Sequence, residues 1–259
     1  MTTTVELAAA RLAEAEQTCS PIDRITDQFT DLTVSDAYEI QLANIRRRTA
    51  RGAVVRGHKV GLSSRAMQQM MNVDEPDYGH LLSDMFIAEN TAIPTAAMCA
   101  PRVEVEVAFV LREGLPAPGC TVADVLRCTA FVCPALEIID SRIRDWNLTL
   151  IDTIADNASS GLVVLGGRVT PLDNLDLRTI GAALRINGAL VTTGAAGAVL
   201  GNPASAVAWL ANKVAQFGVS LDAGNVILPG SCTKAYDVTA GQTVRADFDQ
   251  LGAVSALFV

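Results

Sequence analysis

The stretch VEVEVAFVL (103–111) alternates valine and glutamate at its start, as expected of a β-strand. Alternate residues of a strand share a face, so Glu104 and Glu106 project the same way, with their Cα atoms roughly 6–7 Å apart. The valines between them face the other side, toward a core. Neighbouring carboxylates raise each other's pKa unless a cation lies between them. The stretch therefore predicts either a cation site or the solvated face of an edge strand.

A second stretch, FVCPALEII (131–139), is almost continuously apolar, which is typical of a strand buried on both faces. Glu137 is its single acid. A buried, unpaired carboxylate costs several kcal/mol or takes up a proton, so it needs a cation or a hydrogen-bond partner. A buried ion pair with an arginine would satisfy it. A place beside Glu104 and Glu106 would instead give a three-carboxylate site, whose hard oxygen ligands suit Mg²⁺, Mn²⁺ or Ca²⁺ better than zinc.

The residues around these two strands predict an α+β fold. The first fifty residues are typical of helix, because Asp36 and Glu39 have the spacing of a capping box. The helix that they begin should run to about Arg51 and stop at Gly52. Beyond this point short β-branched runs separated by glycine and proline predict strands at GLVVLGG (161–167), NVILPG (225–230), VRADFD (244–249) and VSALFV (254–259), the last two as a hairpin.

One later helix is expected after Asn202, which caps it, with Pro203 at its first position. Its apolar stripe is Val207, Leu210, Val214 and Phe217. Together these patterns predict a single domain over residues 1–259, with a helical N-terminal part (1–52) and a strand-rich body (53–259) that would carry any catalytic metal site.

Three further segments are candidates for chemistry. Lys59, between glycines in RGHKVGLSS, is interpreted either as a partly buried amine whose pKa desolvation lowers, for proton transfer or anion binding, or as a surface lysine. Ser63 or Ser64 should cap a short helix after it. Turn chemistry explains Asp77 in EPDYGHLL adequately. The small, polar segment DTIADNASSG (152–161) is either a cleft-lining loop or an ordinary turn.

Composition and missing motifs exclude several classes of function. A net charge of −8 argues against a nucleic-acid partner. His58 and His80 lack acid or cysteine partners at ligand spacing and no Gly-x-Ser-x-Gly elbow occurs, so a Ser-His hydrolase is not indicated. No dinucleotide or Walker motif occurs. The chain shows no signal peptide and no apolar stretch long enough for a membrane, and its six cysteines lack metal-ligand spacing, so we expect a cytoplasmic protein with reduced thiols.

Several motifs together resemble those of the 2-hydroxypenta-2,4-dienoate (2-keto-4-pentenoate) hydratases, which share a family with the 4-oxalocrotonate decarboxylases in the fumarylacetoacetase superfamily. The resemblance covers essentially the whole chain, in order, through GHKVGLSS, PDYG, PRVEVEVAFVL, PALEIIDSRIRDW, DTIADNASSG and VLGNPASAVAWLA. It implies a mixed, rolled β-sheet body of fumarylacetoacetase C-terminal-domain type, flanked by helices and assembled into homo-oligomers.

The resemblance also implies a role for each candidate residue. It assigns the metal, Mg²⁺ or Mn²⁺, to Glu104, Glu106 and Glu137. Lys59 and Asp77 match the positions expected to transfer protons. Ser159, the first serine of DNASS, is expected near the substrate carboxylate or the reacting water.

The activity implied is addition of water to the small anionic substrate 2-hydroxypenta-2,4-dienoate, giving 4-hydroxy-2-oxopentanoate in the meta-cleavage catabolism of aromatic or steroid-type compounds. A downstream aldolase or a sister decarboxylase would be the expected protein partner. The alternatives are a 4-oxalocrotonate-type decarboxylase, a C–C hydrolase of fumarylpyruvate type that would need a histidine–acid pair, and a non-catalytic partner subunit.

Overall fold

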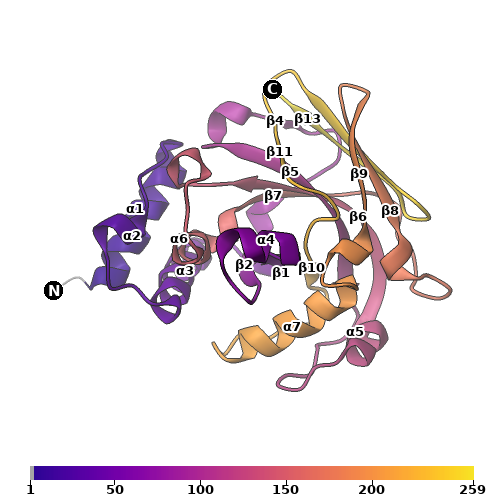
Figure 1. Cartoon of the computed structure of the whole chain (residues 1–259), viewed down its shortest axis with the longest axis horizontal. Coiled ribbons are helices and arrows are strands. Elements are labelled where there is room, and N and C mark those ends of the chain that lie inside the picture. The colour runs from indigo at the N-terminus through magenta and orange to yellow at the C-terminus, as the bar shows by residue number, and fades with distance from the viewer. Residues whose placement is uncertain (1–2) are drawn as a thin grey trace.

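The computed structural model describes residues 3–259, and Figure 1 shows its N-terminal helices packed together beside a strongly curved body of strands. No helix within these residues is both long and apolar enough to cross a bilayer. The α-helices are α1 (Thr4–Thr18), α2 (Ile25–Gln28), α3 (Val34–Thr49), α4 (Arg65–Met71), α5 (Val122–Cys128), α6 (Leu150–Ala155) and α7 (Pro203–Ala215). Single 3₁₀ turns lie at Ser83–Met85, Thr95–Ala97, Arg144–Trp146, Asn157–Ser159, Leu177–Thr179 and Ala196–Ala198.

Helix α3 begins three residues earlier than predicted. The Thr33 hydroxyl accepts a hydrogen bond from the Asp36 amide, and the Asp36 carboxylate accepts one from the Thr33 amide. Asp36 is therefore the last residue of a capping box and not its first, and the predicted pairing of Asp36 with Glu39 is wrong. The helix ends at Thr49, close to the predicted stop at Gly52, whose φ of 103° suits glycine.

A first, mixed sheet carries most of the residues of interest. Its strands follow the order β2-β1-β10-β5-β6-β7-β3, with β11 paired to β5. Strands β1 and β10 are parallel, as are β3 and β7, and the other pairs are antiparallel. The bounds are β1 (Val55–Gly61), β2 (Asp77–Leu82), β3 (Phe86–Ile87), β5 (Pro101–Leu111), β6 (Thr129–Asp140), β7 (Ser160–Leu165), β10 (Val226–Leu228) and β11 (Tyr236–Asp237).

A second sheet packs against the first, since β12 and β13 contact β6, and β13 also contacts β7. Its order is β4-β13-β12-β8-β9. The predicted hairpin of β12 and β13 is confirmed, whereas the hairpin of β8 and β9 has no clear apolar alternation and was not predicted. The bounds are β4 (Ala92–Ile93), β8 (Gly181–Ile186), β9 (Ala189–Ala195), β12 (Thr243–Phe248) and β13 (Gly252–Phe258). The predicted α+β class, with helices followed by a mixed, rolled sheet body, is confirmed. The assignment of residues 1–259 to one catalytic domain stays a prediction.

Helices α7 and α4 start where the sequence predicts. Asn202 caps α7 through its side chain, which accepts a hydrogen bond from the Ala204 amide, and Pro203 is the first residue. Ser64, and not Ser63, caps α4 by accepting a hydrogen bond from the Met67 amide.

One side chain ties the N-terminal helices to the first sheet. Gln41 of α3 is fully buried, and its Nε2 donates to the carbonyl oxygens of Tyr78 on β2 at 2.9 Å and of Ile154 on α6 at 2.8 Å. Its Oε1 lies 3.0 Å from Nδ1 of His80 on β2. A buried amide with all these contacts fixes α3, α6 and β2 relative to one another.

Strand β1 can approach β10 only because residue 57 is glycine. A Cβ at Gly57 would lie 1.8 Å from the carbonyl oxygen of Val226, a backbone atom that no rotamer change can move. We expect Gly57→Ala to lower the free energy of unfolding by about 1–3 kcal/mol or more, because overpacking must shift the strand. Gly181→Ala is the matched control, since nothing lies within 4 Å of its added Cβ, and it should change stability by about 0.5 kcal/mol at most. Guanidinium denaturation measures both, and equal effects would contradict the prediction.

Candidate metal centre and active-site cavity

Strands β5 and β6 bring the three predicted glutamates together. Glu104 lies directly opposite Glu137 in the β5–β6 register, and Glu106 follows on the same face of β5. One carboxylate oxygen from each lies within 4.8 Å of the others. Glu106 and Glu137 are fully buried and Glu104 is half-buried. Because β5 lies inside the sheet, the alternative of a solvated edge strand is wrong, and the valines between the glutamates are in the core as predicted.

Burial and mutual repulsion perturb all three carboxyl groups. Burial is the largest cause that raises the pKa of Glu104, to about 7, against the opposing charge of Lys59. Burial, followed by the charges of Glu137 and Glu104, raises the pKa of Glu106 well above its ordinary value. Burial likewise raises the pKa of Glu137. The cluster thus favours protons or a cation over three free charges.

Lys59 is the positive group nearest the cluster. It lies on β1, its side chain is 4 % exposed, and its Nζ is 3.3 Å from Oε1 of Glu137. The surface interpretation of Lys59 is therefore wrong, and so is an arginine partner for Glu137. Burial alone would lower the pKa of Lys59, but the charge of Glu137 and the nearby acids outweigh it and raise this pKa. The predicted lowering is thus wrong, and Lys59 is held as an ammonium ion.

The unsatisfied oxygens of the cluster fit a metal ion. Oε2 of Glu106 accepts a hydrogen bond from the Gly230 amide at 2.7 Å, whereas its Oε1 and Oε2 of Glu137 are buried without a hydrogen-bond partner among residues 3–259. Oε1 of Glu137 has the Lys59 ammonium group 3.3 Å away. Buried acceptors in native proteins normally have partners. Three convergent carboxylates with free lone pairs are hard oxygen ligands of the kind that Mg²⁺, Mn²⁺ and Ca²⁺ prefer.

Asp77 is not in a turn, which corrects the interpretation made from the sequence. It is the first residue of strand β2, is 1 % exposed, and lies opposite Gly61 of β1. Its Oδ2 accepts a hydrogen bond from the Thr153 hydroxyl at 3.2 Å, while Oδ1 has no partner among the residues described. Burial raises the pKa of Asp77, and the charge of Lys59 partly opposes this rise. Asp77 therefore holds a proton more readily than an exposed aspartate does.

Ser159 lies in a strained segment. Asn157, Ala158 and Ser159 all have positive φ, between 51° and 56°, which is rare for consecutive residues other than glycine. An ion pair that the sequence analysis missed supports them: Arg142 donates through Nε to Oδ1 of Asp156 at 2.5 Å and through its terminal N–H groups to two backbone carbonyls. Strain of this kind at a cavity is typical of functional sites.

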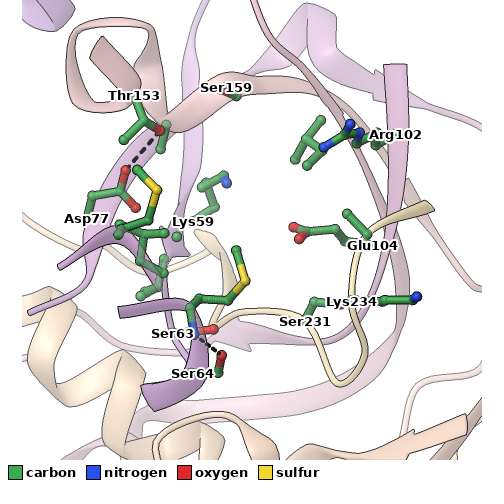
Figure 2. Close-up of a pocket in the computed structure, with 18 of the residues that line it drawn as sticks. Lys59, Ser63, Ser64, Asp77, Arg102, Glu104, Thr153, Ser159, Ser231 and Lys234 are labelled. Atoms are coloured by element: carbon green, nitrogen blue, oxygen red, sulfur yellow. Dashed lines mark hydrogen bonds between the residues drawn. The ribbon is translucent and has the colours of Figure 1, made fainter. Parts of the chain in front are cut away.

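Figure 2 shows these residues around one cavity of about 210 Å³, with Lys59 and Asp77 on one side and Arg102 and Glu104 on the other. The segment 152–161 therefore lines a cleft, although as helix α6 and a 3₁₀ turn and not as a loop. The other lining residues are Val60, Gly61, Leu62, Ser63, Ser64, Met67, Met71, Ile139, Trp146, Leu148, Thr153, Ala158, Ser159, Ser231, Thr233, Lys234 and Ala235. Arg102, Trp146, Ser231 and Thr233 were not predicted as site residues, although Arg102 and Trp146 lie in the motifs PRVEVEVAFVL and PALEIIDSRIRDW.

The two histidines belong to the sheet interior. His58 and His80 are opposite each other on β1 and β2, with ring centroids 4.8 Å apart and exposures of 1 % and 2 %. Burial lowers the pKa of both rings, to about 4 for His80. Neither lines the cavity, so within residues 3–259 no histidine–acid pair is formed there to activate water.

The curved mixed sheet and its charged cavity are those of an enzyme. Residues 49–259 match the family described as fumarylacetoacetate (FAA) hydrolase C-terminal, and the chain belongs to this family. It is 44 % identical to the 2-oxo-hept-4-ene-1,7-dioate hydratase of Escherichia coli (98 % of this chain, 97 % of that protein) and 42 % identical to the 2-keto-4-pentenoate hydratase of Paraburkholderia xenovorans LB400 (98 % and 94 %). The solved 4-oxalocrotonate decarboxylase of Pseudomonas putida G7, complexed with magnesium and adipate, has 38 % identity and a TM-score of 0.95 over 98 % of this chain and 97 % of its own. The resemblance to hydratases and decarboxylases is confirmed.

The electrostatics of the cluster predict that replacing Glu106 with a neutral residue raises thermal stability, and that the increase is larger at high pH. The folded-state pKa of Glu106 lies above its ordinary 4.5, so stability that is present at low pH is lost as the pH rises through the folded-state pKa. In EDTA, Glu106→Gln should raise Tm by about 2–4 °C for each kcal/mol relieved at pH 8.5, and by much less at pH 5.5. Glu14→Gln, on the exposed face of α1, is the control and should change Tm little at either pH. Thermal unfolding measures this, and an equal gain at both pH values would contradict it.

Proposed function

We propose that the chain is a divalent-metal-dependent hydratase that adds water to 2-hydroxypenta-2,4-dienoate, or a homologue extended at C5, to give 4-hydroxy-2-oxopentanoate or its homologue. The single observation that carries the proposal is the cluster of Glu104, Glu106 and Glu137, whose member Glu104 lines a small cavity together with Lys59 and Asp77. The names of the two hydratases with 42–44 % identity support the reaction type.

In this proposal Glu104, Glu106 and Glu137 hold the metal ion, for which Mg²⁺ and Mn²⁺ fit equally well. The unsatisfied oxygens of Glu106 and Glu137 support this assignment. A bound divalent cation supplies electrostatic stabilisation to negative charge that develops at the C2 oxygen of the substrate. The magnesium in the solved decarboxylase supports a dication in this kind of fold.

The remaining residues bind the substrate and move protons. Lys59, held as an ammonium ion, attracts the substrate carboxylate and donates a hydrogen bond to it. Asp77, whose burial raises its pKa, donates a proton to C5 while the C2 hydroxyl of the dienol loses its proton to water, so that the 2-oxo-3-enoate forms and C4 becomes electrophilic. Ser159 is 3 % exposed at the cavity wall and orients the substrate carboxylate or the water that adds to C4.

The second candidate is decarboxylation of 4-oxalocrotonate. The overlap with the solved decarboxylase, at a TM-score of 0.95, favours it specifically. Both reactions place negative charge at the C2 oxygen, so the same cluster and Lys59 serve either. A C–C hydrolase of fumarylpyruvate type is disfavoured, because His58 and His80 lie away from the cavity. Assembly into a homo-oligomer, association with an aldolase or a sister decarboxylase, and a cytoplasmic location stay predictions.

The proposed activity is tested by mixing EDTA-treated protein with freshly generated 2-hydroxypenta-2,4-dienoate and following the loss of its ultraviolet absorbance. We expect loss only after Mg²⁺ or Mn²⁺ is added, with 4-hydroxy-2-oxopentanoate as product. Release of CO₂ from 4-oxalocrotonate without hydration would instead support the decarboxylase, and metal-independent turnover would contradict the assigned cluster.

Two variants separate metal binding from proton transfer. Glu106→Gln should lower kcat/KM by about 10²–10³-fold even at saturating Mg²⁺, because it removes a ligand and a charge. Asp77→Asn should lower kcat by about 10²–10⁴-fold while Mn²⁺ affinity, measured by electron paramagnetic resonance, stays within about threefold. Near-normal activity of Glu106→Gln, or loss of Mn²⁺ binding in Asp77→Asn, would show that these roles are wrongly assigned.

A further inference from the structure

Thr153 is a cavity residue to which the proposed reaction gives no role. It is 7 % exposed, and its hydroxyl donates a hydrogen bond to Oδ2 of Asp77 at 3.2 Å, which is drawn as a dashed line in Figure 2. A threonine inside a helix often donates instead to the carbonyl oxygen four residues earlier. Within residues 3–259 the Thr153 hydroxyl makes no hydrogen bond besides the one to Asp77, so its single hydrogen is directed at the carboxyl group.

Thr153 is held in place by its neighbours on both sides along the chain. The carboxylate of Asp152 is buried and accepts hydrogen bonds from the amide and the hydroxyl of Thr26, at 3.1 and 3.0 Å. The carbonyl oxygen of Ile154 accepts a hydrogen bond from Nε2 of Gln41 at 2.8 Å. Helix α6 therefore cannot turn to withdraw the Thr153 hydroxyl from Asp77 without breaking these hydrogen bonds.

Gly61 leaves free the space that the other oxygen of Asp77 occupies. It lies opposite Asp77 in the pairing of β1 with β2, and a Cβ at this position would lie 2.1 Å from Oδ1 of Asp77 and 3.1 Å from its Cγ. Oδ1 is buried and has no hydrogen-bond partner among the residues described. Lys59 lies two residues before Gly61, so the carboxyl group leans over the face of β1 that carries this amine.

These two contacts distinguish the oxygens of Asp77. Because Oδ2 accepts the hydrogen of the Thr153 hydroxyl, it is the carbonyl oxygen of the protonated carboxyl group, and the proton then resides on Oδ1. An acid in an active site has to present its proton in one direction, and a misplacement of about 1 Å can cost about 10²-fold in rate.

We propose that Thr153 and Gly61 are positioning residues, which fix the Asp77 carboxyl group with its transferable proton on Oδ1. This inference rests on the proposed function, in which Asp77 donates a proton to C5 of the dienol. In that step the C2 hydroxyl loses its proton to water, and the Asp77 carboxylate then regains a proton from the solvent. The competing interpretation is that Thr153 is an ordinary buried hydroxyl, whose hydrogen bond only stabilises the contact between α6 and β2.

The test compares two tautomers of one substrate at saturating Mg²⁺. 2-Hydroxypenta-2,4-dienoate needs a proton at C5, whereas 2-oxopent-3-enoate already carries this proton and needs only the addition of water at C4. We expect Thr153→Val to lower kcat on the dienoate by about 10- to 100-fold, with KM within about threefold. Its kcat on 2-oxopent-3-enoate should stay within about threefold of the wild-type value. Thr153→Ser keeps the hydroxyl and should recover most of the activity on the dienoate.

Gly61→Ala tests the second contact. The atoms nearest to the added Cβ all belong to the Asp77 side chain, so the carboxyl group and not the backbone has to move. We expect the same selective loss on the dienoate, by about 10-fold or more, while Mn²⁺ affinity stays within about threefold of the wild-type value.

Thr129→Val is the matched control. Thr129 is also fully buried, and its hydroxyl donates to the carbonyl oxygen of Val125 at 2.7 Å, away from the cavity. The ratio of the two kcat values should keep its wild-type value in this variant. Equal losses on both tautomers in Thr153→Val, or an unchanged kcat on the dienoate, would overturn the inference. So would a wild-type chain that hydrates the dienoate but not 2-oxopent-3-enoate.

A structural measurement keeps the inference separable from the hydratase proposal. If the wild-type chain hydrates neither tautomer with metal present, the proposed function has failed. Crystal structures of the wild-type and Thr153→Val chains then decide the role of Thr153. Rotation of the Asp77 carboxyl group in the variant, with the glutamate cluster unmoved, supports positioning by Thr153, whereas an unchanged carboxyl group overturns it.

Discussion

The crowding of three carboxylates around one ammonium group is the constraint on which the rest of the structure depends. Glu104, Glu106 and Glu137 lie on β5 and β6, the two strands with the longest pairing, and in the part of the chain described Lys59 alone makes an ion pair with this cluster. Such a cluster is unfavourable without a cation, so the sheet around it has to supply the compensating stability. The long pairing of β5 with β6 and the apolar residues behind these strands supply this stability. They hold the carboxylates in positions that selection for stability alone would not favour.

Three further features border this cluster or its cavity. Asp77 has a buried oxygen without a partner, Asn157 to Ser159 adopt left-handed conformations in succession, and Gly230 reaches Glu106 with a φ of 123°. The first two are unfavourable by themselves, and the third requires glycine. The surrounding ion pair of Arg142 and Asp156 is buried and well hydrogen-bonded, which is how a protein retains strain of this kind. Strain retained beside a cavity in this way is typical of functional sites.

The sequence predicted what depends on local pattern and missed what depends on topology. The alternation of Glu104 and Glu106 and the isolation of Glu137 were enough to predict a shared carboxylate site, because strand periodicity fixes which side chains share a face. Asp77 was misread, since a proline before and a glycine after an aspartate have the composition of a turn whether or not a strand begins there. The direction of the Lys59 pKa shift was also missed, because it depends on how many acids the fold brings to one amine. The Arg142–Asp156 pair carries no local signal.

The buried amide of Gln41 has a consequence for how this chain is divided. The family match begins at residue 49, so α1, α2 and most of α3 precede it, yet Gln41 contacts the strand that begins with Asp77 and the helix that carries Thr153. The N-terminal helices thus stabilise the strand and the helix that form part of the cavity wall. A recombined protein that joined the strand-rich body to a different N-terminal segment would need a buried amide in the position of Gln41, able to make the same hydrogen bonds to β2 and α6. This requirement limits how far the sequence of the N-terminal segment can vary in evolution.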